Sequence, residues 1–547
     1  MIRIEHLPAD ILGLTPLQRA ALSGKLDLSH APVARRVDAI ARPRERFVPD
    51  ERAHLAKWLE AQVTSNGPHV AALDSIRSLA QTGATCVLCT LRPALLGGPL
   101  RGLWQVLQTI KLAEALRASW KTPVIPVVWN LADDHHTPPA NRAFLLNRNY
   151  DVQKIHLANL STGRAPLAAL PLEQERHRLG AVRAVLSQLF GDYSEIERAI
   201  DIFAPRDGET LPGAMTRALY DLLGHTGLVV VEPDWLREDL SRTLAHAIGA
   251  RIQPPLRNGL ANFEALGFDA QVDIDAAAIV HHVDAGGRTP LRAGGEGYCY
   301  DDEPGSRTRS ELAAEIVQEP GAWHAGELLR PLVRETVLPV AACVGDDEEL
   351  TAHLILGELR KLLGAPTPAF VPRVSVTGID GDGVDSLERM ETDVEAVLRT
   401  RGTLELAPEA LPDPELLEDL REVARKAKEE LRQHKPRLVE LDRALGSILK
   451  RSTGQIETAV SKLAEKVQRV QSNRTGKSLR HLRRLNHGLC PNGAPQEDVF
   501  GPFPWVARFG SCWIDEFLAQ LDPFTVEHLV LYISGDEEVS DPGSASL

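Results

Sequence analysis

The alternation of apolar and polar stretches predicts a βαβ unit between residues 84 and 131. Residues 84–91 (ATCVLCTL) and 124–131 (VIPVVWNL) are short apolar runs, which are typical of buried parallel strands. Between them, residues 100–120 carry apolar side chains at helical spacing, after a loop over 92–99. A strand, a helix and a second strand within some 50 residues indicate a parallel sheet covered by helices.

The same kind of signal recurs along the chain. Apolar runs predict further strands at 228–231, 337–344 and 528–533, and helical spacing predicts helices near 51–64, 214–223 and 348–363. Residues 253–309 are Gly-rich and are expected to be irregular, with short β-like pieces. The predicted fold is therefore α/β, with a Rossmann-like parallel-sheet core and connecting insertions.

Residues 412–485 follow a different pattern. Apolar residues at 3–4 spacing predict two long amphipathic helices that form an antiparallel coiled coil, with the turn at residues 452–454 (SerThrGly). Pro436 is expected to kink the first helix. Narrow apolar seams bury little area alone, so a protruding arm that dimerises is favoured over a bundle packed on its own core.

These patterns predict four regions. Residues 1–408 form the α/β core, with the irregular insertion at 253–309, and residues 409–486 form the coiled coil. Residues 487–534 return to the core. Residues 535–547 are acidic and rich in Gly and Ser, so a disordered tail is expected.

Charge and cysteine content narrow the function classes. The net charge of −14 argues against a general nucleic-acid binder, although residues 415–485 carry 18 Lys and Arg against 10 Asp and Glu. Six cysteines in 547 residues are no disulfide framework. The first residues do not resemble a signal peptide, and no apolar stretch approaches the roughly 20 residues of a membrane span. We therefore expect a cytoplasmic protein without a membrane partner.

The strongest candidate site is the run Asp133, Asp134, His135 and His136, which follows the strand at 124–131 directly. In open α/β sheets, ligands lie beyond the carboxyl ends of strands. A carboxylate beside an imidazole can orient a general base, or such groups can hold a divalent metal. A solvated turn that caps a helix is the structural alternative. Adjacent side chains diverge, which disfavours a metal held by all four, so no metal site is predicted.

Other residues offer weaker signals. Gly97 and Gly98 open the helix at 100–120, where free N–H groups could receive an anion, and Arg92 and Arg101 flank this turn. Cys86 and Cys89 lie in an apolar strand and point to opposite faces, which favours a buried structural role. Two further candidates border the strand at 337–344: Arg330 could clamp a carboxylate, and Glu349 could cap or act at the next helix. The turn at 491–497 contains Asn492, Gln496 and Glu497.

Taken in order, these motifs resemble the bacillithiol biosynthesis cysteine-adding enzymes, from about Cys86 to the last strand. The similar stretches are LLGGPL (95–100) with TIKLAEAL (109–116), VVWNLADDHH (127–136), residues 328–350, and LCPNGAPQED (489–498). The resemblance implies a Rossmann-like core, a coiled coil used for homodimerisation, and a ligase that adds cysteine to the amine of glucosaminyl-malate. Amide formation is uphill in water, so ATP is expected, and adenylate and acyl phosphate both stay open as the activated species.

The resemblance also implies roles for the candidate residues. His135, held by Asp133 or Asp134, would deprotonate the attacking ammonium. The substrate-binding wall would comprise Arg92, Gly97, Gly98, Arg101, His136, Arg330, Glu349, Asn492, Gln496 and Glu497.

The chain departs from the family pattern at Thr90-Leu91-Arg92, where the family has Gly-Gln-Gln, and at Gln105. Asp498 stands where the family has Arg, and the acid–histidine cluster is altered as well. Two alternatives therefore stay open. One is a non-catalytic or altered-substrate relative that serves as a dimeric scaffold or ligand sensor, and the other is a metal-dependent hydrolase or transferase.

Overall fold

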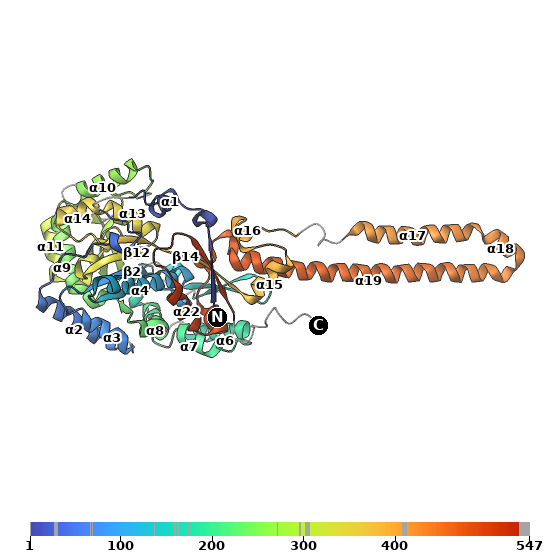
Figure 1. Cartoon of the computed structure of the whole chain (residues 1–547), viewed down its shortest axis with the longest axis horizontal. Coiled ribbons are helices and arrows are strands. Elements are labelled where there is room, and N and C mark those ends of the chain that lie inside the picture. The colour runs from blue at the N-terminus through green and yellow to red at the C-terminus, as the bar shows by residue number, and fades with distance from the viewer. Residues whose placement is uncertain are drawn as a thin grey trace. The chain divides into compact units, whose positions relative to one another are not determined.

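The computed structural model describes residues 2–26, 31–65, 67, 69–135, 137–157, 160, 163–172, 176–270, 272–294, 297–300, 307–406 and 413–534. The chain forms two compact units. The core unit comprises residues 1–147, 152–380 and 494–547, and the helical unit comprises residues 148–151 and 381–493 (Figure 1). The predicted tail at 535–547 and His136 lie outside the described residues.

The core unit is built on a five-stranded, fully parallel sheet with the strand order β13-β12-β2-β3-β6. Its strands are β2 (Thr85–Leu91), β3 (Val124–Asn130), β6 (Val229–Val231), β12 (Val340–Gly345) and β13 (Ala369–Pro372). The order runs outward in one direction from β2 to β6 and in the other from β12 to β13. The switch point of this doubly wound sheet therefore lies between β2 and β12.

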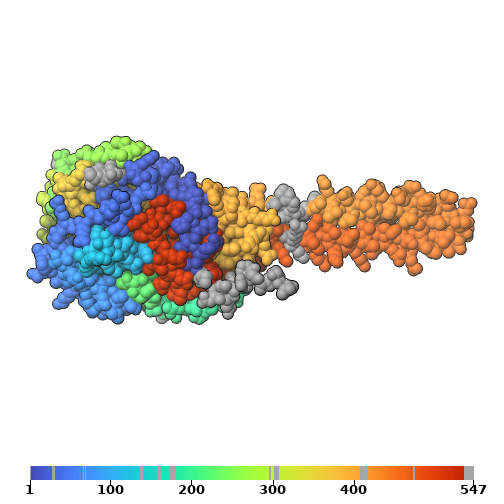
Figure 2. Space-filling view, in the orientation of Figure 1, coloured from blue at the N-terminus to red at the C-terminus, as the bar shows by residue number. Residues whose placement is uncertain are grey.

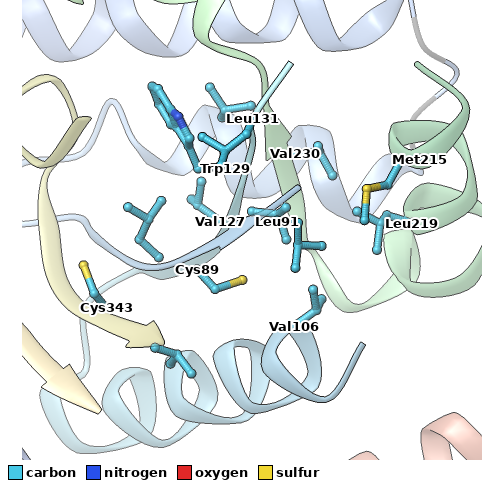
Figure 3. Close-up of a cluster of buried hydrophobic side chains, with 14 of the residues drawn as sticks. Cys89, Leu91, Val106, Val127, Trp129, Leu131, Met215, Leu219, Val230 and Cys343 are labelled. Carbon is cyan, nitrogen blue, oxygen red and sulfur yellow. The ribbon is translucent and has the colours of Figure 1, made fainter. Parts of the chain in front are cut away.

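The predicted βαβ unit is confirmed. Helix α4 (Leu100–Trp120) connects β2 to β3 and packs against both strands. Figure 3 shows Val106 of α4 on one side of the strands that carry Cys89 and Val127, with Trp129 on the other. Cys86 and Cys89 are both buried, which confirms the structural interpretation. Each buried aliphatic side chain in such a layer contributes roughly 1.5–3 kcal/mol to folding.

Pro126 lies inside β3, although proline removes a backbone donor from a sheet. The short strand β6 pairs only with residues 127–129 of β3, so Pro126 has β2 as its single neighbour. The length of β6 thus explains how a central strand tolerates this proline.

Two further sheets, of five and three strands, belong to the core unit. An antiparallel sheet has the order β10-β9-β8-β7-β11, and the sheet β1-β15-β14 joins the two ends of the chain. Figure 2 shows the N-terminal segment in dark blue beside the C-terminal segment in red, as the pairing of β1 with β15 requires. These strands are β1 (Ile2–Leu7), β7 (Ala278–Asp284), β8 (Gly287–Gly294), β9 (Gly297–Tyr300), β10 (Arg307–Thr308), β11 (Trp323–Ala325), β14 (Ser375–Asp380) and β15 (His528–Ile533). A hairpin of β4 (Arg142–Leu146) and β5 (Val152–His156) is separate.

The remaining helices of the core unit are α1 (Pro16–Leu22), α2 (Pro49–Thr64), α3 (Val70–Ser78), α5 (Thr137–Ala140), α6 (Arg176–Phe190), α7 (Ile196–Phe203), α8 (Leu211–Leu223), α9 (Arg237–Gly249), α10 (Gln253–Ala265), α11 (Arg309–Gln318), α12 (Arg330–Val337), α13 (Asp347–Ile355), α14 (Gly357–Leu363), α20 (Gln496–Val499), α21 (Phe503–Phe509) and α22 (Cys512–Gln520). Within the described part of the chain, no helix has both the length and the apolar character needed to cross a membrane.

Three local predictions need correction. The segment 253–309 contains the expected β pieces as strands β7–β10, but these pair as a regular antiparallel sheet, and the segment also contains α10. The strand predicted from Val337 begins at Val340, because the apolar run also includes the buried last turn of α12. The helix predicted over 348–363 is two helices, α13 and α14.

The helical unit contains α15 (Gly381–Arg389), α16 (Val394–Arg399), α17 (Pro414–Gln433), α18 (Lys435–Leu441) and α19 (Arg443–Leu489). Helices α17 and α18 run beside α19, so the antiparallel hairpin is confirmed (Figure 1). Pro436 lies in the first turn of α18, directly after α17 ends, as expected for a helix break.

The predicted turn at residues 452–454 is wrong. These residues lie inside α19, where the Thr453 hydroxyl donates to the carbonyl of Leu449 at 3.0 Å. The turn is instead at Asp442, which has an extended backbone and caps α19 by accepting from the Ala444 N–H at 2.8 Å. A Ser-Thr-Gly run is compatible with a helix when its hydroxyls bond to the preceding turn.

Candidate functional site

The acidic cluster lies at the carboxyl edge of the parallel sheet. Asp133 and Asp134 follow the end of β3, and Arg92 follows the end of β2. Because β2 and β3 are parallel neighbours, these segments emerge side by side, and Arg92 Nε lies 4.0 Å from Asp134 Oδ2. Arg92 Nη2 also lies 3.7 Å from Glu348 Oε2, at the start of α13, so this side chain extends across the switch point.

Asp133 is buried among positive groups. Its Oδ2 lies 3.7 Å from Arg237 Nη2 and 3.7 Å from His324 Nδ1. Burial alone would raise the pKa of Asp133, but the surrounding positive charges, with Arg330 the strongest, lower it well below its usual range. Asp133 is therefore a fixed carboxylate at neutral pH.

Asp134 and His135 are held by a second arginine. The Asp134 carboxylate accepts the backbone N–H of His135 at 2.7 Å, and Arg288 Nη1 lies 3.9 Å from the same Oδ1. Arg288 Nη1 also donates to His135 Nδ1 at 3.1 Å, whereas that nitrogen is 3.8 Å from Asp134 Oδ1. The hydrogen bond at His135 Nδ1 thus comes from a guanidinium and not from a carboxylate.

The antiparallel sheet supplies residues that the sequence did not reveal. Arg288 is on β8, and its Nη2 donates to His281 Nδ1 on β7 at 3.1 Å. Burial, the Arg288 charge and His135 lower the pKa of His281 far below its usual value. Burial lowers the pKa of Arg288 to about 10 and that of His324, on β11, well below normal. No local motif marks these residues, because only the fold of the insertion brings them to the acidic cluster.

Arg330 meets Asp133 at an internal cavity of about 20 Å³, which is about the space of one water molecule. Trp129, Arg237, Trp323 and Arg334 also line it, together with apolar side chains of α9 and α12. Nε and Nη2 of Arg330 and Nε of Arg237 are buried and have no hydrogen-bond partner among the described residues. Buried donors of this kind require acceptor oxygens, which one water molecule or one oxygen of a ligand would supply.

A polar network fills the switch point between β2 and β12. The Gln105 amide donates to the carbonyl of Val344 at 2.8 Å and to Glu349 Oε2 at 3.2 Å. Arg334 donates to the Thr90 hydroxyl, and its Nη2 is 3.4 Å from Glu349 Oε1. Burial raises the pKa of Glu349, although Arg334 opposes the shift. The positions that depart from the family pattern therefore bind the two members of one ion pair: Thr90 binds Arg334, and Gln105 binds Glu349.

The turn at Gly97 and Gly98 is packed closely against its neighbours. Both glycines have positive φ, of 83° and 70°, and a Cβ at Gly97 would lie 2.9 Å from the Phe203 ring. The Leu100 N–H at the start of α4 donates to the carbonyl of Phe500 at 2.8 Å. The glycines thus serve close packing here, and a role in anion binding stays a prediction.

Arg101, the other predicted arginine of this turn, is about half exposed, and its Nη1 lies 3.5 Å from Asp498 Oδ1.

The C-terminal candidates occupy structural hydrogen bonds. Glu497 accepts from Arg373 at 3.0 and 3.1 Å, from the Ser375 hydroxyl and from the Val376 N–H. Gln496 binds the backbone N–H and carbonyl of Gly378 at 2.8 and 2.9 Å. These bonds attach α20 to β14. Asn492 belongs to the helical unit and has a positive φ of 54°, as Asn-Gly turn chemistry allows.

Glu232, which directly follows β6, was not singled out from the sequence. It accepts from the Thr216 hydroxyl at 3.0 Å, and Thr216 in turn accepts from Asn130, the last residue of β3, at 3.0 Å. Burial, with a contribution from Asp234, raises the pKa of Glu232 to about 7. A carboxyl group that titrates near neutral pH thus lies at the same edge of the sheet as the acidic cluster.

Comparison with known proteins gives two matching family models. The model described as Bacillithiol biosynthesis BshC, N-terminal Rossmann-like domain, matches residues 31–374, and the model for the C-terminal coiled-coil domain of the same family matches residues 385–533. Several relatives carry the name "Putative cysteine ligase BshC", and three of them are compared with this chain. The relative from Koribacter versatilis is 28% identical over 86% of this chain and 88% of its own. The relative from Geobacillus thermodenitrificans is 24% identical over 88% of this chain and 91% of its own. The relative from Heliobacterium modesticaldum is 26% identical over 82% of this chain and 83% of its own.

Proposed function

Because this chain belongs to the BshC family of bacillithiol biosynthesis, we propose that it is a ligase that joins the carboxyl group of cysteine to the amine of glucosaminyl-malate. The bond formed is an amide, and water is lost overall. This reaction is uphill in water, so we propose that ATP supplies the activation of the cysteine carboxyl group.

The observation that carries the proposal is the excess of positive charge at the carboxyl edge of the sheet. Three buried guanidinium groups, those of Arg237, Arg288 and Arg330, surround the two buried carboxylates of Asp133 and Asp134. Arg92 is half exposed, and Arg92 and Arg237 also lie near the exposed carboxylates of Glu348 and Asp234. Histidine does not add to this excess, because the pKa values of His281 and His324 are lowered. The malate part of the acceptor carries two carboxylates, which would balance the charge and satisfy the buried donors of Arg330 and Arg237.

The fit of ATP to this edge rests on fewer residues. Arg92 and Arg101 are each about half exposed and could neutralise phosphate oxygens. The start of α4 fits phosphate less well, because the Leu100 N–H already donates to the carbonyl of Phe500 and the turn at Gly97 packs against the Phe203 ring. We therefore assign phosphate binding to the arginines rather than to the helix start.

We also propose a homodimer formed through the coiled coil. Several apolar side chains of α17–α19 are exposed in the single chain, among them Val423 at 60%, Leu463 at 50% and Val470 at 58%. Exposed apolar residues along a helical hairpin favour association with a second copy. Changing these three to Ser should convert a dimer into a monomer in analytical ultracentrifugation. A protein that is monomeric before the change would overturn this part of the proposal.

The ligase proposal is tested with purified full-length protein, cysteine, ATP and glucosaminyl-malate, with a family member of known activity as the positive control. The thiol product is measured by mass spectrometry after labelling of the sulfur. For Arg330→Met we expect the KM for glucosaminyl-malate to rise about 10–100-fold while the KM for cysteine stays within a factor of two. Arg242→Met removes a 62% exposed arginine and is the matched control. If the positive control forms product and this protein does not, the proposal fails.

One observation favours a second candidate, a scaffold or ligand sensor without catalysis. Thr90, Gln105, Arg334 and Glu349 bind one another at the switch point, where a ligand of a doubly wound sheet is expected. Binding of glucosaminyl-malate in a thermal-shift assay without product formation would select this candidate. Among the described residues, which do not include His136, no group of three or more His, Cys, Asp or Glu side chains could hold a metal ion.

A further inference from the structure

Arg288 connects two histidines at the edge of the site. Its side chain is 1% exposed, and its two terminal nitrogens donate separately to His135 Nδ1 and to His281 Nδ1, each at 3.1 Å. A guanidinium has N–H donors and no acceptor. Whichever ring nitrogen faces it must therefore offer a lone pair.

This contact determines the position of the ring proton in both histidines. A neutral imidazole has one N–H and one lone pair, so a ring that accepts at Nδ1 carries its proton on Nε2. An imidazolium would lose the acceptor and place a second positive charge against Arg288. The carboxylate of Asp134 does not reverse this choice, because its Oδ1 is 3.8 Å from His135 Nδ1, too far for a hydrogen bond.

We infer that Arg288 is a positioning residue that holds His135 as a neutral Nε2–H imidazole, so that His135 donates a hydrogen bond in the reaction instead of accepting a proton. The tautomer follows from the geometry alone, whereas the role in the reaction rests on the proposed ligase function. The sequence motif predicted a different role, in which Asp133 or Asp134 holds His135 as a general base.

The chemistry of amide formation provides a use for such a donor. The protonated amine loses one proton to water, and its neutral nitrogen then bonds to the activated cysteine carbonyl carbon, whose oxygen takes up negative charge. The nitrogen, now positively charged, loses a second proton to water. When the carbonyl is restored, the leaving group departs with the electron pair of its bond. A donor aimed at the charged oxygen stabilises this step, and removing one such donor typically costs about 100–1000-fold in kcat. The 25% exposed side chain of His135 is the member of the His281–Arg288–His135 chain that substrate can reach, since the other two are buried.

The tautomer is tested directly in the full chain. Protein labelled with ¹⁵N-histidine gives long-range ¹H–¹⁵N correlations that distinguish the Nδ1–H form, the Nε2–H form and the imidazolium. Signals are assigned with His135→Gln and His281→Gln. We expect both rings in the Nε2–H form between pH 6 and 8. An Nδ1–H or doubly protonated His135 at pH 7 would overturn the inference, whether or not the protein is a ligase.

Variants of Arg288 separate positioning from folding. In Arg288→Met, His135 should show a mixture of tautomers and should begin to titrate, while Arg242→Met should leave the spectrum unchanged. Arg288→Lys also offers only N–H donors and should keep the Nε2–H form of His135. If the methionine variant does not fold, the wild-type and lysine spectra still decide the assignment.

The role in the reaction is tested by comparing two substitutions of His135. Glutamine has an amide N–H₂ that can replace the Nε2–H donor but is not a base, whereas alanine offers neither function. A donor role predicts that His135→Gln retains at least 10-fold more kcat than His135→Ala. A base role predicts that the two are equally inactive, which would overturn the assignment. A wild-type protein without ligase activity would refute the proposed function and leave the tautomer result standing.

Discussion

Glu232 provides a prediction whose magnitude follows from the structure. The carboxyl group lies after β6, is partly buried, and accepts one hydrogen bond from Thr216. Burial, with a contribution from Asp234, raises its pKa from 4.5 to about 7. In the unfolded chain the pKa returns to the ordinary value, so the folded state holds this proton more tightly between these two pH values.

The sign of the effect is fixed by this difference. The stabilisation from the protonated carboxyl is complete below pH 4.5 and is lost as the pH rises through 7. The full difference between the folded and unfolded pKa values of Glu232 corresponds to roughly 3 kcal/mol of stability. Solvent screening at the partly exposed carboxyl group reduces this contribution to about 1.5–3 kcal/mol. Glu232→Gln keeps the acceptor for Thr216 and cannot ionise. We therefore expect the free energy of unfolding of the variant, relative to that of wild type, to be about 1.5–3 kcal/mol higher at pH 8 than at pH 4.

The assay is urea unfolding of wild type and Glu232→Gln at pH 4, 6 and 8, followed by tryptophan fluorescence. All eight tryptophans lie in the core unit, so the signal reports that unit alone. Glu264→Gln changes an exposed glutamate of the same unit and is the matched control. A Glu232→Gln difference that does not grow between pH 4 and pH 8 would refute the reasoning.

Three further predictions test other parts of the structure. Asp133→Asn removes the buried carboxylate from its arginines and should destabilise the core unit by about 3–5 kcal/mol at pH 7. Because the pKa of Asp133 is lowered, this deficit should shrink only below about pH 4, measured in the same unfolding assay. Gly97→Ala should destabilise the core unit by about 1–3 kcal/mol more than Gly163→Ala in the same assay. Both glycines have positive φ, but only a Cβ at Gly97 would meet an aromatic ring. Equal losses of stability in the two variants would contradict the packing argument. Gly454→Ala should stabilise the helical unit by about 0.5–1 kcal/mol in thermal melts followed by circular dichroism, since residue 454 is helical with open space at its Cβ position, whereas a turn there would give a loss.

The local elements of the core were accessible from the sequence because their signals are local. The apolar runs at 84–91 and 124–131 are nearly continuous, which is typical of buried strands. Helix α4 likewise spans the residues whose apolar side chains recur at helical spacing. The position of Asp133 and Asp134 at a strand end followed from the same pattern. Where a signal was shared by two structures, prediction failed. The apolar run before β12 also contains the end of α12, and the Ser-Thr-Gly run is compatible with either a turn or a helix.

The partners of the acidic cluster were decided by the tertiary structure. Arg288 is 153 residues from His135 in the chain, and His324 and Arg237 come from two further elements. Periodicity specifies which face of an element is buried but not which distant element covers it. For that reason the sequence predicted where the candidate site lies and which acidic side chains it contains, but not their partners. The fold of the inserted sheet decided which nitrogen of His135 carries the proton, because that choice depends on a donor brought by β8.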